Sequence, residues 1–189
     1  MLKPPARLAF FASALTFLLS AAPVSAGSFR SDVSKVGTAT IEVAFSPNMG
    51  ATDLVVKAIG EAHRTIRVAA YSFTSKPIAQ ALLKAHKRGV DVKVVVDKSQ
   101  AKAKYTSARF LANVGIPTRI DHRYAIMHSK FIVIDGVNVE TGSFNFTLAA
   151  EHKNAENVLV LRNDAAVARK YTDAWTRLWN ESETLRPNY

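Results

Sequence analysis

Four polar side chains with related chemistry stand close together in the second half of the chain. His128 and Lys130 come at the start of an apolar run, and Ser143 and Asn145 follow the next β-rich run. Residues two apart on a strand point to the same face, so each pair shares one side of its strand. An imidazole can act as a nucleophile, and ammonium, hydroxyl and amide groups donate hydrogen bonds to phosphate oxygens. The set therefore suits chemistry on a phosphate ester.

The turn between the two runs predicts how these side chains meet. Asp135-Gly136 is typical of a two-residue hairpin turn. Such a turn places Lys130 opposite Thr141 and His128 opposite Ser143, so both arms deliver polar residues to the same open end. The ammonium disfavours protonation of the neighbouring imidazole, which favours a neutral, nucleophilic ring.

These residues carry a resemblance to a known family. The run from His128 to Asp135 matches the H-x-K-x4-D signature of the phospholipase D superfamily, and Gly142 to Thr147 matches its G-S-x-N-x-T element. The chain resembles the short, single-motif bacterial endonuclease branch, the Nuc-type nucleases. The resemblance extends from about Asp53 to the C-terminal helix, and includes Ala70–Phe73 and Arg88–Lys93.

The resemblance implies a role for each site residue. His128 would attack phosphorus and form a phosphohistidine, while Lys130, Asn145 and Ser143 would hold the phosphate. Glu156 would orient the ring of His128. The family signature also includes Asp135 as a candidate site residue. Asp135 is seven residues from His128, so on a continuous strand the two side chains would face opposite sides of the sheet. Because an aspartate before glycine is also typical of a hairpin turn, we expect a structural role for Asp135.

The family mechanism needs two histidines, and the chain has one motif. None of His63, His86, His122 and His152 has a lysine two residues on and an aspartate five beyond that. The single-motif branch implies a homodimer with the active site on its twofold axis. No metal and no cofactor are implied, because the sequence has no H-E-x-x-H, EF-hand loop or tight carboxylate cluster.

Strand-like and helix-like segments alternate around these residues. The pattern predicts one layered α/β domain over 27–189. The resemblance implies that this domain has a phospholipase D-like fold, with a central mixed sheet flanked by helices. The expected strands are Thr40–Phe45, Thr65–Phe73, Val90–Asp97, Lys130–Asp135, Val137–Gly142 and Val158–Leu161, and the expected helices are Thr52–Arg64, Ser75–Gly89, Tyr105–Asn113 and one containing Asp173–Trp179.

The first 26 residues are typical of a cleaved signal peptide. Lys3 and Arg7 precede the apolar stretch Leu8–Leu19, and small residues end it before Gly27. The alternative is an uncleaved membrane anchor. Export to the periplasm or the medium follows from cleavage, with no stable membrane partner afterwards. The chain has no cysteine, which excludes thiol nucleophiles, zinc knuckles and disulfides.

The charge favours a polyanionic partner. The net charge is +10, or +8 without Lys3 and Arg7. Six cations around the predicted site could line a groove that tracks a phosphate backbone without reading bases, or could be an ordinary solvated face. They are Lys98, Lys102, Lys104, Arg109, Arg119 and Arg123.

We therefore expect a metal-independent phosphodiesterase that cleaves DNA or RNA with low sequence specificity. One alternative is a phospholipase D that hydrolyses phospholipid headgroups, which requires an apolar entry surface. The other is a non-catalytic nucleic-acid-binding module. The intact set of His128, Lys130 and Asn145 argues against it, because binding alone needs no nucleophile.

Overall fold

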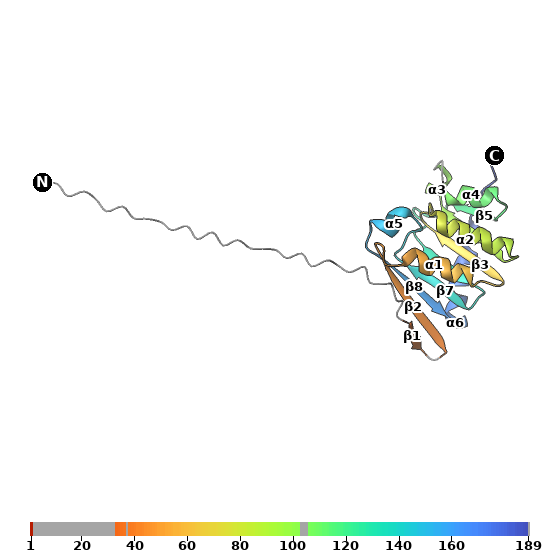
Figure 1. Ribbon diagram of the computed structural model, residues 1–189. Coiled ribbons are helices and arrows are strands. Elements are labelled where there is room, and N and C mark those ends of the chain that lie inside the picture. Colours follow the sequence, from red (N-terminus) through yellow and green to blue (C-terminus); the bar gives the residue numbers. More distant parts are fainter. Residues whose placement is uncertain (2–32, 37, 103–105, 189) are drawn as a thin grey trace.

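A nine-stranded mixed sheet with helices on both faces forms the part of the chain that the structure describes (Figure 1). The computed structural model describes residues 1, 33–36, 38–102 and 106–188, so the expected leader lies, apart from Met1, outside the described residues. The strand order is β1-β2-β8-β7-β6-β3-β4-β5-β9. The predicted α/β layered fold is confirmed.

The elements follow one another along the chain with short connections. In order they are β1 (Val33–Val36), β2 (Ala39–Ser46), α1 (Ala51–Gly60), β3 (Thr65–Ala70), α2 (Lys76–Lys87), β4 (Asp91–Asp97), α3 (Ser99–Lys102), α4 (Ser107–Asn113), β5 (Thr118–Asp121), β6 (Lys130–Ile134), β7 (Asn138–Gly142), α5 (Leu148–His152), β8 (Glu156–Arg162), α6 (Ala165–Glu181) and β9 (Glu183–Thr184).

Parallel pairing is confined to β3, β4 and β5, toward the β9 edge of the sheet. Strand β4 pairs in parallel with both β3 and β5, and helices α2 and α4 lie in the crossovers between them. Strand β6 runs antiparallel to β3, so its first residue, Lys130, pairs with Ala70 at the carboxyl end of β3. This edge of a mixed sheet is where α/β proteins commonly bind ligands.

Strand β6 is buried on both faces, as its apolar run predicts. Ile132 and Ile134 pack in the larger core under α1 and α2, whereas Phe131 and Val133 pack with Trp175 of α6 on the opposite face. The indole of Trp175 donates to the backbone oxygen of Val68 at 2.9 Å, which ties α6 to the sheet. In the described part of the chain no helix is both long and apolar enough to cross a membrane.

The predicted two-residue turn of the β6–β7 hairpin is wrong by one residue. Ile134 pairs with Asn138, so the connection has three residues, and Lys130 does not lie opposite Thr141 as expected. Asp135 and Gly136 both have positive φ, 55° and 71°. The carbonyl of Val137 accepts a hydrogen bond from the amide of Asp164 at 2.9 Å, so Val137 serves the β8–α6 connection and not the ladder.

Candidate active site

His128 and Lys130 lie at the carboxyl ends of the central parallel strands. The amide of Tyr71, just after β3, donates to the backbone oxygen of Ser129 at 3.0 Å, which holds the segment between the two residues against the sheet. The side chain of His128 is exposed, whereas Lys130 is only 8% exposed. The site therefore combines an accessible imidazole with a buried ammonium.

Lys130 binds His128 directly. Its Nζ lies 3.2 Å from Nδ1 of His128 and 2.7 Å from the backbone oxygen of the same residue. An ammonium only donates, so Nδ1 accepts in this arrangement and a neutral ring carries its proton on Nε2. Burial lowers the pKa of Lys130 below its usual range, and the carboxylate of Glu156 offsets part of that shift.

The aromatic ring of Tyr71 lies close to both His128 and Lys130. Its ring centroid lies 4.7 Å from that of His128, and the ammonium of Lys130 lies 5.3 Å from the same ring. An aromatic face attracts a cation, so Tyr71 helps to keep the charge of Lys130 at the site. In the sequence Tyr71 was visible only as part of the matched run Ala70–Phe73.

The loop that carries His128 is anchored by Asp97 at the end of β4. The carboxylate accepts from the amide of Met127 at 2.8 Å through one oxygen and from the amide of Ser99 at 2.8 Å through the other. Burial acts to raise the pKa of Asp97, but these amide hydrogen bonds outweigh it and lower the pKa. Asp97 fixes the residue next to His128, a role that sequence reasoning missed.

Ser143 and Asn145 lie beyond the end of β7 and not on its continuation. The strand stops at Gly142, and the hydroxyl of Ser143 accepts from the amide of Asn157 at 3.1 Å and from its side-chain nitrogen at 3.3 Å. Oδ1 of Asn145 is buried without a hydrogen-bond partner among the described residues. Such an orphaned acceptor is uncommon in folded proteins and marks a site where a partner is expected.

Gly142 is required where β7 meets β8. A Cβ at this position would lie 2.1 Å from the backbone oxygen of Asn157. The close approach of the two backbones sets where Ser143 leaves the strand.

Glu156 begins β8 at the same end of the sheet. Its carboxylate accepts a hydrogen bond from the side chain of Asn154 at 3.1 Å. The negative charge of that carboxylate favours the protonated form of Lys130 and so raises the pKa of the lysine. Within one copy of the described chain, Nδ1 of His128 contacts Lys130 and not Glu156. The ring-orienting role of Glu156 stays a prediction.

Asp135 follows the opposite end of β6 from His128, and the five residues of the strand between them span about 16 Å. Its carboxylate accepts from the backbone amides of His63, Arg64 and Thr65 at 2.7–2.9 Å. Burial acts to raise its pKa, but these hydrogen bonds prevail and lower it. These hydrogen bonds tie the β6–β7 turn to the start of β3, and a structural rather than catalytic role for Asp135 stays a prediction.

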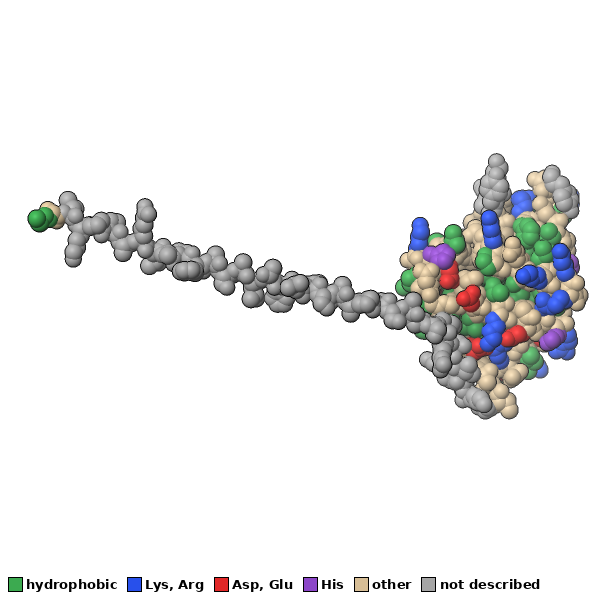
Figure 2. Space-filling model, viewed as in Figure 1, with side chains coloured by type: hydrophobic (Ala, Val, Ile, Leu, Met, Phe, Trp, Pro, Cys, Tyr) green, Lys and Arg blue, Asp and Glu red, His purple; other side chains and the backbone are tan. Residues whose placement is uncertain are grey.

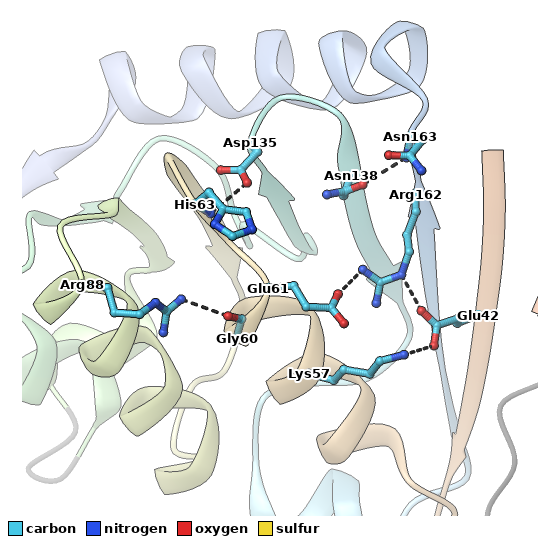
Figure 3. A network of polar contacts seen from close by, with 10 residues as sticks. All are labelled: Glu42, Lys57, Gly60, Glu61, His63, Arg88, Asp135, Asn138, Arg162 and Asn163. Carbon is cyan, nitrogen blue, oxygen red and sulfur yellow. Dashed lines mark hydrogen bonds and ion pairs between the residues drawn. The ribbon is translucent and has the colours of Figure 1, made fainter. Parts of the chain in front are cut away.

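The same far end of the sheet carries a charged network (Figure 3). Arg162 of β8 pairs with Glu42 of β2 and with Glu61 just after α1. Lys57 of α1 also pairs with Glu42, at 2.6 Å. These contacts join α1 to two strands at the end of the sheet opposite His128.

Four of the six predicted groove cations already contact other residues of the protein. Lys98 donates to Tyr124, Arg109 to Ala101 and Arg119 to Trp179, in each case to a backbone oxygen. Arg123 pairs with Glu181 at 3.6 Å. Lys104 and the side chain of Lys102 lie outside the described residues. Lysines and arginines are spread over the face seen in Figure 2 and form no single stripe there.

A cavity of about 430 Å³ opens beside the imidazole. Helix α6 forms one wall and the ends of β6 and β7 form the other. Its lining residues are His128, Ser129, Lys130, Phe131, Thr141, Gly142, Lys170, Tyr171 and Ala174. Sequence reasoning did not select Lys170 or Tyr171, because the helix pattern shows that α6 packs on the sheet but not which of its residues reach the hairpin end. Among the described residues, no three His, Asp or Glu side chains gather as a metal site.

Comparison with known proteins agrees with this geometry. A family model described as "Cardiolipin synthase, PLD-like domain" matches residues 55–179. A protein named "Phospholipase D" from Rickettsia bellii is 38% identical over 144 residues, 76% of this chain and 71% of the relative. A "Mitochondrial cardiolipin hydrolase" from Xenopus laevis is 35% identical over 136 residues, 72% of this chain and 64% of the relative. The crystal structure of Nuc from Salmonella typhimurium, a phospholipase D family member, superposes with a TM-score of 0.76 at 43% identity, over 78% of this chain and 99% of Nuc.

Proposed function

We propose that this chain, which belongs to the phospholipase D superfamily, hydrolyses phosphodiester bonds in nucleic acid without a metal ion, with His128 as the nucleophile. The observation that carries the proposal is the exposed imidazole in contact with a buried ammonium at the mouth of a cavity. That pair supplies a nucleophile and a phosphate-binding cation in one place.

In the first step, a ring nitrogen of His128 attacks phosphorus, a P–N bond forms and the P–O bond to the leaving group breaks. Lys130, the hydroxyl of Ser143 and the amide of Asn145 donate to the phosphate oxygens. Because Lys130 binds Nδ1 in the free site, an arriving phosphate draws the ammonium away and releases that nitrogen. The proton of the neutral ring then moves from Nε2 to Nδ1 by exchange with solvent, and Glu156, which lies near Lys130, is the candidate to accept a hydrogen bond from Nδ1 and leave Nε2 free to attack.

Both steps need a second acid–base group. The partner's His128 protonates the leaving oxygen and then takes a proton from water as that water attacks phosphorus and breaks the P–N bond. A homodimer with two facing copies of the motif supplies it. The activity per chain should therefore fall when dilution dissociates the dimer, as measured by comparing rates with sedimentation at the same concentrations.

Nucleic acid is the preferred substrate class. The net charge of +8 that remains without Lys3 and Arg7, and the likeness to Nuc, of which the match covers 99%, support it. Export through the predicted leader is part of the proposal, and mass spectrometry of the secreted protein should find Gly27 at its N-terminus.

Phospholipid headgroups are the second candidate. Relatives named "Phospholipase D" and "Mitochondrial cardiolipin hydrolase" favour them. Ile126, two residues before His128, is 55% exposed and offers an apolar contact near the site.

Plasmid cleavage in excess EDTA tests the proposal. The wild-type protein should nick and degrade the plasmid, His128→Ala should lose all activity, and His63→Ala should keep it because that exposed side chain lies at the far end of the sheet. Equal cleavage by wild type and His128→Ala would place the chemistry elsewhere. Cleavage by neither, together with turnover of phospholipid vesicles, would select the second candidate.

A further inference from the structure

Helix α6 brings a cation and an aromatic ring to the cavity beside His128. Lys170 and Tyr171 are consecutive residues of this helix, and both line the cavity that also contains His128 and Lys130. They belong to an element that follows both halves of the family motif in the chain.

Lys170 is available to bind an anion. Its side chain is exposed, and within the described ranges no carboxylate lies at ion-pair distance from it. Two other cations that contact α6 are already engaged: Arg119 lies over the ring of Trp179 at 4.3 Å, and Arg67, 5.4 Å from the ring of Trp175, pairs with Asp91. Lys130 is likewise engaged, with His128.

Tyr171 is held in place before any ligand binds. Its half-buried ring makes an edge-to-face contact with Phe131 of β6, with the centroids 5.1 Å apart and the planes at 73°. A side chain that is already fixed loses little conformational entropy on binding, so it makes an effective wall for a ligand.

The cavity is larger than the reacting phosphate requires. Cavities that take a drug-sized molecule start at about 300 Å³, and this one measures about 430 Å³. One phosphate held by Lys130 would leave room along α6 for the group attached to it. In a nucleic acid that group is a nucleoside, followed by another phosphate.

We propose that Lys170 and Tyr171 form a subsite for the nucleotide adjacent to the scissile phosphodiester. Lys170 binds the neighbouring phosphate and Tyr171 packs against the nucleoside between the two phosphates. This subsite rests on the proposed function and gives α6 a part in selecting a polynucleotide over an isolated diester.

A pair of substrates separates this role from the chemistry. A dinucleoside monophosphate has only the scissile phosphate, whereas a single-stranded dodecathymidylate also has neighbouring ones. Lys170→Ala should lower kcat/KM on the dodecamer about tenfold, as expected for a lost hydrogen bond to a charged group. The slope of log kcat/KM against log salt should also become shallower by about 0.7. The dinucleoside monophosphate should be cleaved as by wild type.

Matched variants test the two side chains. Lys87→Ala removes the same charge from the far end of α2 and should change neither substrate. Tyr171→Ala should also cost about tenfold on the dodecamer, while Tyr171→Phe should keep most of the activity because the ring remains. Unchanged thermal midpoints would show that the variants are folded.

Three results would overturn the subsite. Lys170→Ala could slow both substrates equally, which would place Lys170 in the chemistry, or it could slow neither. Lys170→Ala could also leave cleavage of the dodecamer unchanged and slow only the hydrolysis of cardiolipin in vesicles, which would mean that Lys170 binds a lipid phosphate. If the wild-type protein leaves both nucleotides intact, the proposed function itself fails and the subsite fails with it.

Discussion

Replacing Glu140 by glutamine should stabilise the protein by an amount that grows as the pH rises. Glu140 is 1% exposed, lies on β7 between Ile132 and Val160, and has no hydrogen-bond partner for either carboxylate oxygen among the described residues. Burial raises its pKa to about 8 from 4.5. A carboxyl group in these surroundings keeps its proton at neutral pH.

The sign follows from proton binding in the two states. Above about pH 4.5 the unfolded chain releases the proton of Glu140, whereas the folded protein holds it up to about pH 8. The unfolded state therefore binds fewer protons over this window, and the free energy of unfolding falls as the pH rises. The loss is about 1.4 kcal/mol per pH unit, or about 3 kcal/mol between pH 5 and pH 7.5.

Urea unfolding at several pH values measures this effect. The difference in unfolding free energy between Glu140→Gln and wild type should rise by about 3 kcal/mol from pH 5 to pH 7.5, because glutamine does not titrate. Glu183→Gln, an exposed position on β9, serves as the control and should give a flat difference. A difference for Glu140→Gln that does not change with pH would refute the reasoning.

Three further substitutions test the supports of the site and the fold. Asp97→Asn, which weakens the acceptor that holds Met127, should lower the thermal midpoint and also lower kcat severalfold in protein that is still folded at the assay temperature, and an unchanged kcat would exclude a positioning role. Gly142→Ala should lower both activity and the thermal midpoint, because its Cβ would meet the backbone oxygen of Asn157, and a wild-type midpoint would contradict this packing. Asp135→Asn should cost about 1–3 kcal/mol in urea unfolding through its three backbone amides, while the folded fraction keeps its kcat; a loss of kcat in folded protein would place Asp135 in the chemistry.

The sequence predicted the central strand and the paired motifs well, because their signals are local. The apolar run of Lys130–Ile134 indicated a strand buried on both faces. One face of this strand packs in the larger core under α1 and α2, and the other packs against α6. The spacing of His128 and Lys130 indicated that they act together, and their side chains are in contact. Short edge strands such as β1 and β9 were not predicted, since a few residues carry little pattern.

The parts that escaped prediction depend on contacts distant in sequence. The β6–β7 register shifted because the carbonyl of Val137 binds the amide of Asp164. Asp97 reads in the sequence as the end of a strand, and its hydrogen bond to Met127 spans 30 residues. Lys170 appears only as an exposed helix residue until α6 is seen to cross the end of the hairpin.

The burial of β6 on both faces has a consequence for the motions of the site. Amide hydrogens of Phe131, Ile132 and Val133 lie in ladders with β3 or β7 under two cores, so they should exchange with solvent only when the whole domain opens. His128 precedes this slowest-exchanging segment by three residues, and Lys130 precedes it by one. Lys130, the residue that begins this strand and pairs with Ala70, should therefore keep its place until the domain opens as a whole.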